Sequence, residues 1–337
     1  MGDVYEIQEV LPEEQREING ELKLDGSYDT TGALERLWRR FLDQALQQGR
    51  DELTAIVSLL GMSLLCAVAS AFCSTAAMRE AVDRIGCCAA ALLLTQNVSA
   101  LFSQASNTVL RLSDYSHAAL PVIFTISAAS GAVISASTRY AAASLVMDVM
   151  ITAAQRFILP LIYAYLALTI SQSLFENSVM AMLLNLIKWA ITTLLTTLTL
   201  AFSTYLSLTA LISGSADAVA IKSTRTVISR TLPVVGGILA DSASVFLSAA
   251  GMIRNSAGVF ALIAVCSLCV VPVALLLVKT LAFKLTAVIA DFQPGSHFAK
   301  LISSMGNVFA MLLGLVGSCW AMLFISLVSG IKAVSVG

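Results

Sequence analysis

The sequence predicts an all-α protein, a polytopic transmembrane helical bundle, from three observations. Of its 337 residues, 58% are hydrophobic and 12% are charged, whereas about a quarter of the residues in a soluble domain are charged. From residue 53 onward, apolar stretches recur with about the 20 residues that a helix needs to cross a bilayer core of about 30 Å. Nothing in the sequence resembles the short alternating strands of a membrane barrel, which leaves helices as the spanning elements.

Residues 1–52 are predicted to form an extramembrane region that precedes a membrane domain over residues 53–337. An amphipathic helix is expected over residues 33–48, because six apolar side chains share one helical face: Leu34, Leu37, Phe41, Leu42, Ala45 and Leu46. This helix is expected to pack on the chain itself, or else to lie on the membrane surface or on a partner. The first residues lack the basic and apolar regions of a signal peptide. Either the chain inserts through its first span or a leader has been removed.

Seven spans are predicted, at about 53–73, 86–110, 119–138, 157–175, 184–212, 259–283 and 305–331. The loops on one side of the membrane, which include Arg139 and Arg156, would then hold more lysines and arginines than the loops on the other side. This bias predicts an N-terminus outside the cytoplasm and a C-terminus inside it. The basic cluster before residue 53 favours the opposite orientation unless a leader has exported it.

The last predicted span carries a stripe of small residues. The stripe repeats every four positions at Gly306, Ala310, Gly314 and Ser318, and Ser326 and Gly330 continue it. Small residues at this spacing allow another helix to approach closely. The sequence leaves open whether that helix belongs to the same chain or to a neighbouring subunit.

Two segments of the chain align without gaps and suggest an internal repeat. LPVIFTISAASGAVISA (residues 120–136) and LPVVGGILADSASVFLS (residues 232–248) share Leu, Pro, Val, Ile, Ala, Ser and Val at corresponding positions. Chance matching in a sequence rich in small residues is the alternative. A true repeat predicts two halves, each with a short helix that starts at a proline, Pro121 or Pro233, and is re-entrant or half-length.

Several residues in these segments are candidates for helix breaks or for a polar pathway. Gly236 and Gly237 allow a bend after Pro233, and Gly131 is the corresponding small residue of the first segment. Asp241 is expected to face protein or water, because a carboxylate that faces lipid costs several kcal/mol, about 2.5 or more.

Other polar residues fall within or near predicted spans, namely Gln96, Asn97, Gln104, Asn107 and Asp148. Gln96, Ser99, Ser103 and Asn107 recur at helical spacing and form one polar face. This face either lines a water-filled route or joins helices through hydrogen bonds.

The motifs of common enzyme classes are not found. The sequence contains no phosphate loop, dinucleotide fingerprint or His-Glu-x-x-His motif, and its two histidines, His117 and His297, are expected in loops. Cys266 and Cys269 have no nearby ligand partners and are interpreted as small buried hydrophobic residues. We expect no enzyme activity, no metal, no cofactor and no nucleic-acid partner.

The run from Lys222 to Gly258 resembles the signature region of the stage III sporulation protein AE family. The matching positions are Lys222, Arg225, Pro233, Val234, Gly236, Asp241, Asn255 and Gly258. Ser130-Gly131-Ala132-Val133 is similar to an earlier small-residue segment of that family, and the order of an exported N-terminal region followed by spans also agrees. Members usually carry a signal sequence, which this sequence lacks.

The resemblance implies a permease-like subunit of the membrane complex that joins the mother cell to the forespore. Implied partners are other subunits of that complex, including a cytoplasmic ATPase and ring-forming membrane proteins, in a homo- or hetero-oligomer in the mother-cell membrane. The protein would sustain late gene expression in the forespore. The basic residues Lys222, Arg225 and Arg230 would dock the ATPase or anionic lipids, or would only anchor the cytoplasmic side.

Three functions follow from the sequence. In the first, Asp241 and the polar face near Asn107 line a pathway through a permease-like or channel-forming subunit. In the second, the helices are sealed and the protein is a scaffold that assembles other subunits. In the third, the protein is a stand-alone transporter of a small solute or ion.

Overall fold

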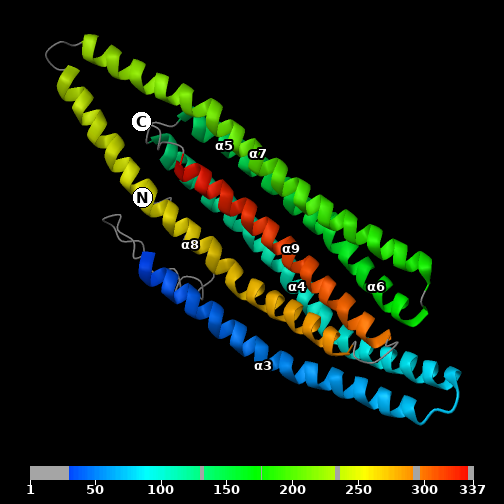
Figure 1. Ribbon diagram of the computed structural model, residues 1–337. Coiled ribbons are helices and arrows are strands. Elements are labelled where there is room, and N and C mark those ends of the chain that lie inside the picture. Colours follow the sequence, from blue (N-terminus) through cyan, green and yellow to red (C-terminus); the bar gives the residue numbers. More distant parts are fainter. Residues whose placement is uncertain (1–29, 130–132, 176, 232–235, 291–296, 333–337) are drawn as a thin grey trace.

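The computed structural model describes residues 30–129, 133–175, 177–231, 236–290 and 297–332. Over these ranges all the elements are helical: α3 (Thr30–Ala71), α4 (Ala76–Ala129), α5 (Val133–Ala153), the π-helical turn η1 (Ala154–Ile158), α6 (Leu159–Phe175), α7 (Ser178–Thr231), α8 (Gly236–Ala290) and α9 (His297–Lys332). Because α5, η1 and α6 form one continuous rod, six long rods lie side by side and alternate in direction (Figure 1). The start of α3 and the end of α9 lie toward the same end of the bundle.

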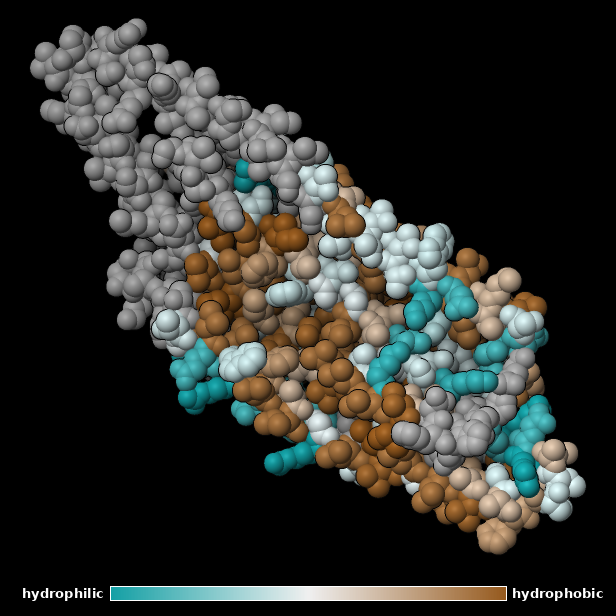
Figure 2. All heavy atoms as spheres, in the orientation of Figure 1, coloured by the Kyte–Doolittle hydropathy of each residue, from teal (hydrophilic) through white to brown (hydrophobic). Residues whose placement is uncertain are grey.

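Within the described residues, four helical segments are long and apolar enough to cross a membrane. They are Ala136–Phe175, Ser178–Phe202, Gly258–Ala290 and Phe298–Ile331, and Ile56–Ala71 is a shorter apolar segment. Figure 2 shows hydrophobic side chains over the middle of the bundle. The prediction of an all-α membrane protein is therefore confirmed for the described residues, while the count of seven spans is not.

Several predicted boundaries are wrong because the helices are longer than the hydropathy segments. α4 has 54 residues, or about 81 Å at 1.5 Å per residue. It contains the predicted span 86–110 and, with Pro121 inside it, the first part of 119–138. That second segment is not one helix, since α4 ends at Ala129 and α5 begins at Val133. A proline within a packed membrane helix is tolerated because neighbouring groups satisfy the freed carbonyl, so Pro121 does not start an element.

The second copy of the proposed repeat is not a short helix either. Pro233 lies outside the described residues, and the helix that follows it, α8, continues for 55 residues from Gly236 to Ala290. Gly236 and Gly237 therefore lie in the first turn of a long helix. The structure gives no support to re-entrant or half-length elements at either proline.

α3 joins the two predicted N-terminal elements into one helix that passes through the predicted domain boundary at residue 52. Three of the six residues of the predicted amphipathic face are half-buried, namely Leu37, Phe41 and Ala45. Leu34 and Leu46 are exposed, by 61% and 66%. With Trp38 and Leu42 they form an exposed apolar row along this part of α3.

α9 lies at the centre of the bundle and contacts α4, α5, α6, α7 and α8. Its buried side chains form one broad face, and the opposite side holds smaller or polar residues such as Ser303, Asn307 and Gly314. The fully buried ones include Ile302, Val308, Leu312, Leu315, Met322 and Leu327.

The small-residue stripe of α9 packs against helices of the same chain. A Cβ atom on Gly306 would lie 3.5 Å from Phe283 Cβ of α8, and one on Gly330 would lie 2.9 Å from Ile123 Cγ2 of α4. Gly314 is looser, with its nearest neighbour, Leu195 Cδ1 of α7, at 3.8 Å. Ala310 and Ser318 are half-buried. The closest approach is therefore at the end of the stripe, where α9 meets α4.

Replacing Gly330 by alanine will destabilise the protein, while the same change at Gly314 will not. The new methyl group at residue 330 would collide with Ile123 and Phe124, and overpacking of this kind costs about 1–3 kcal/mol. At Gly314 the methyl group has room, and alanine gains up to about 1 kcal/mol of helix propensity. Thermal unfolding of the purified variants in detergent micelles measures both. Equal shifts for the two variants would contradict the packing described here.

Candidate functional site

The polar face predicted on α4 lies on the outside of the bundle. Ser99, Ser103 and Asn107 are exposed and Gln104 is half-buried. The side chains of Gln96 and Asn97 lie outside the described part of the structure. The exposed face continues along the same helix through Arg111, Asp114 and His117. The face therefore does not line a route inside a single protomer.

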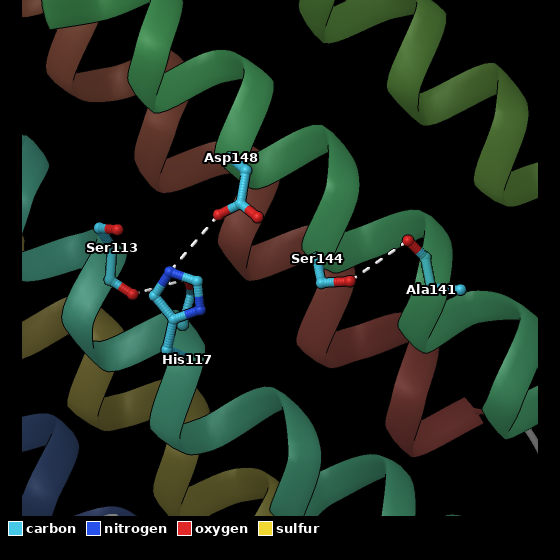
Figure 3. Close-up of polar contacts among 6 residues, drawn as sticks. Ser113, His117, Ala141, Ser144 and Asp148 are labelled. Atoms are coloured by element: carbon cyan, nitrogen blue, oxygen red, sulfur yellow. Dashed lines mark hydrogen bonds and ion pairs between the residues drawn. The ribbon is translucent and has the colours of Figure 1, made fainter.

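His117 and Asp148 meet on this outer surface, from α4 and α5 respectively (Figure 3). His117 Nε2 lies 3.4 Å from Asp148 Oδ1, and each side chain is 58% exposed. The expectation that His117 lies in a loop is wrong, because it is inside α4. The two residues are too far apart in sequence for spacing to pair them. Only the packing of α4 against α5 brings them together.

Inside the bundle, polar groups join helices to one another. Ser106 Oγ of α4 donates to Gln155 Oε1 at 3.0 Å, and Gln155 Nε2 donates to the Ser106 carbonyl at 3.2 Å. Gln155 belongs to η1, and π-helical turns are frequent at functional sites. The Tyr115 hydroxyl donates to the Ala261 carbonyl of α8 at 3.2 Å. These bonds connect helices across an apolar core, which is the joining role that interhelical hydrogen bonds have in membrane bundles.

A buried arginine holds the C-terminal end of α9. Arg139 of α5 is 4% exposed, and its Nη1 donates to the Ser329 carbonyl at 2.7 Å. The neighbouring Gly330 carbonyl accepts a bond of 2.6 Å from Ser127 Oγ of α4. A cation at the C-terminus of a helix is favourable for the helix dipole. The expectation that Arg139 lies in a loop is therefore wrong, since its charge is used within the bundle.

A polar cavity at the opposite end of the bundle was missed by the sequence reasoning. It has a volume of about 290 Å³ and lies between α6, the start of α7 and the start of α9. Among the described residues, its lining comprises the apolar Leu184 and six polar residues: Thr169, Gln172, Ser173, Ser178, Lys300 and Ser304. The signal in the sequence was the four-residue spacing of Thr169 and Ser173, repeated by Lys300 and Ser304. This spacing places each pair on one face of an otherwise apolar helix.

About one helical turn beyond Ser304, Asn307 of α9 makes further polar contacts to α8 and α6. Lys284 Nζ of α8 donates to Asn307 Oδ1 at 2.6 Å. The Tyr165 hydroxyl lies within hydrogen-bonding reach of Asn307 and Thr169.

The remaining predicted residues are placed by backbone alone or not at all. Lys222, Arg225 and Arg230 lie on α7, and Asp241 and Asn255 lie on α8, but their side chains are outside the described part, as is all of Gly131. Gly258 is buried in α8, not at a helix break, and a Cβ atom on it would collide with Ile331 of α9. Gly258 is therefore a packing residue.

The described residues offer few side chains for metal binding or redox chemistry. No group of three or more His, Cys, Asp or Glu side chains there could hold a metal ion. The seven cysteines are free, and Cys269 and Cys319 are buried among apolar side chains.

These features define a helical membrane protein whose polar groups gather on one outer face and in one end cavity. The family model of stage III sporulation protein AE matches residues 23–333, nearly the whole chain. The chain belongs to this family, as its resemblance over residues 222–258 indicated. No curated protein and no solved structure matches it.

Replacing Arg139 by glutamine will destabilise the protein by about 2 kcal/mol, because a buried bond to a charged donor and a favourable interaction with the helix dipole are both lost. Arg156 is the matched control, since it lies in the same rod but is exposed. Chemical unfolding in detergent micelles measures both. A larger loss for Arg156→Gln than for Arg139→Gln would show that Arg139 does not hold α9.

Proposed function

We propose that this protein is a permease-like subunit of the membrane complex that joins the mother cell to the forespore, and that it sustains late forespore gene expression. Its family membership supports a role in a multi-protein sporulation complex. The observation that carries the permease-like part is the exposed polar face of α4, together with the His117–Asp148 pair.

That face lies at the same depth as helices that are apolar enough to cross the membrane. Near one end of it, Ile123 and Phe124 of α4 contact Gly330 of α9. Near the other end, the ring of Phe102 stacks on Tyr163 with centroids 3.7 Å apart. α9 and the rod that contains Tyr163 are both candidate spans. The stretch of α4 between these contacts therefore lies alongside them.

Polar and charged side chains at this depth need a cover other than lipid. A charged side chain at the centre of a lipid-facing helix costs about 2.5–3.5 kcal/mol. Asp148 lies within the candidate span Ala136–Phe175 and is more than half exposed. Water or another subunit against this face removes the cost. We therefore propose that the pathway forms at the surface of the protomer, where subunits meet, and not through the protomer's packed core.

The finer topology is part of the proposal. Crossings by α3 and α4, in addition to the four candidate spans, would give six. Six crossings would place both termini on the same side of the membrane, in agreement with the start of α3 and the end of α9 lying toward the same end of the bundle. An N-terminus outside and a C-terminus inside the cytoplasm therefore require that one of the long helices does not cross. The relation between the segments at Pro121 and Pro233, and a role for Asp241 in the pathway, stay predictions.

We propose a cytoplasmic docking role for the far ends of α7 and α8. Gly258 meets Ile331 near the end of α9, so α8 before Gly258 continues past α9 for about 33 Å at 1.5 Å per residue. α7 carries Lys222, Arg225 and Arg230 in the adjoining stretch. Cations at the cytoplasmic side follow the positive-inside rule and suit docking of the ATPase or of anionic lipids.

A non-conducting scaffold is the second candidate, favoured by the exposed apolar row on α3. Leu34, Trp38, Leu42 and Leu46 recur every four residues, and each is at least 41% exposed. A row of this kind suits a partner helix. Family membership favours either role over that of a stand-alone transporter.

Replacing Asp148 by asparagine, or His117 by glutamine, will reduce late forespore gene expression while protein level and folding are retained. An exposed pair contributes only about 0–1 kcal/mol to stability. A charged lining raises the local solute concentration by at least about tenfold, so we expect a loss of that order. A forespore-specific reporter and an immunoblot measure the two quantities.

The control is Glu80→Gln, which removes an exposed carboxylate paired with Arg84 on the same helix, outside the polar face. Co-purification with the other subunits separates the two functions. A reporter loss with intact co-purification supports a pathway, and a reporter loss with failed co-purification supports the scaffold. Normal reporter activity in both pair variants would refute a functional role for this face.

A further inference from the structure

The outer side of α4 carries a row of residues that are spaced alternately three and four positions apart. Its exposed members are Ala100, Ser103, Asn107, Leu110, Asp114 and His117, and the half-buried Pro121 continues the spacing. We call these seven residues the α4 ridge. Their spacing is that of the heptad repeat, along which two helices pack in a left-handed seam. The ridge is therefore compatible with a second helix that runs along it.

Lipid is an unsuitable cover for the α4 ridge, because four of its residues are polar or charged. Phe102 of the same helix stacks on Tyr163, which belongs to the candidate span Ala136–Phe175, so the ridge begins at the depth of the membrane. Polar groups at that depth need protein or water around them. Small residues such as Ala100 and Ser103 allow a helix to approach closely. An asparagine at one heptad position favours pairing with the same residue of an identical helix.

The charges on this face complement one another across a two-fold axis. Arg111 and Asp114 are both exposed and lie three residues apart, about 4.5 Å along the helix axis. Two copies inserted in the same orientation are related by an axis along the membrane normal, so their α4 helices run parallel and equal depths meet. Arg111 of each copy then lies within reach of Asp114 of the other copy. Asp148 and Arg156 on the adjoining rod keep the numbers of exposed acidic and basic groups equal. A surface with this balance fits an identical surface.

We propose that the α4 ridge packs against the α4 ridge of a second copy of this chain, in a parallel two-fold pair. Asn107 meets Asn107 of the second copy near the middle of the seam, and Arg111 and Asp114 form ion pairs between the copies. This inference rests on the proposed function, because it names the subunit that covers the polar face. Asp148 and Arg156 then lie at the edge of the seam, beside the proposed pathway.

Energy transfer between donor-labelled and acceptor-labelled full chains in phosphatidylcholine vesicles measures the pairing. Arg111→Glu, or Asp114→Arg, will lower the association constant at least about tenfold, because each change places like charges of the two copies opposite each other. The double variant Arg111→Glu with Asp114→Arg restores association to within about threefold, because the ion pairs form again with reversed sign. Lys188→Glu is the matched control, since Lys188 is an exposed cation of α7 that lies on a candidate span but not on α4. It is expected to change association less than about twofold, the effect of a screened surface charge.

Disulfide cross-linking tests the position of the seam without altering a charge. Ser103→Cys on the ridge will cross-link two copies under mild oxidation, whereas Thr196→Cys, an exposed position of α7, will not. Both changes are made together with Cys88→Ser, because Cys88 is the exposed natural cysteine. Circular dichroism checks the fold of each variant.

Selective loss of association in the single charge variants, its recovery in the double variant and a cross-link at residue 103 support the proposal. A chain that stays monomeric at every protein-to-lipid ratio overturns it, as do equal losses in the Arg111 and Lys188 variants or a cross-link at residue 196 without one at 103. These outcomes concern the second copy alone. The reporter experiment on His117 and Asp148 decides the pathway separately.

Discussion

The bundle depends on burying the broad apolar face of α9, which carries its large hydrophobic side chains. Helices with an apolar face gain stability by packing that face against neighbours, and α9 contacts five other helices. Small residues set how close those helices come, most tightly where Gly330 meets Ile123. The same end of α9 is fixed by hydrogen bonds from Ser127 and Arg139. The positions of α4, α5 and α8 follow from these contacts.

In the bundle formed around α9, the polar side chains occupy three kinds of position. Some join helices inside the core, as Ser106 and Gln155 do. Some collect in the end cavity, where the N-terminal turns of α7 and α9 meet. The rest face outward on α4 and α5, where His117 and Asp148 pair. The first group joins helices within the described protomer, whereas the other two lie at its surface or at the end of the bundle.

The sequence predicts the helical membrane class and the family, because both depend on composition and on a local motif. It fails on helix boundaries, because hydropathy divides a helix wherever polar residues collect, although its backbone continues. Pro121 illustrates this: it reads as a helix start but lies inside α4. The sequence also does not predict which distant residues pair, and the reason is different. His117 and Asp148, like Arg139 and Ser329, meet only through tertiary packing, which no spacing rule encodes. The cavity lining could have been found in part, from the repeated four-residue spacing of its polar residues.

α4 shows why hydropathy and packing must be read together. α4 carries exposed polar side chains such as Asn107 and Arg111, yet its residues Phe102 and Ile123 contact two helices that are candidate spans. A polar helix can lie at that depth only if its polar side is shielded from lipid. Its inner side is already covered by α8 and α9, so the shielding must come from outside the protomer. This requirement is the reason why the proposed pathway lies at the outer surface of the protomer, against water or another subunit.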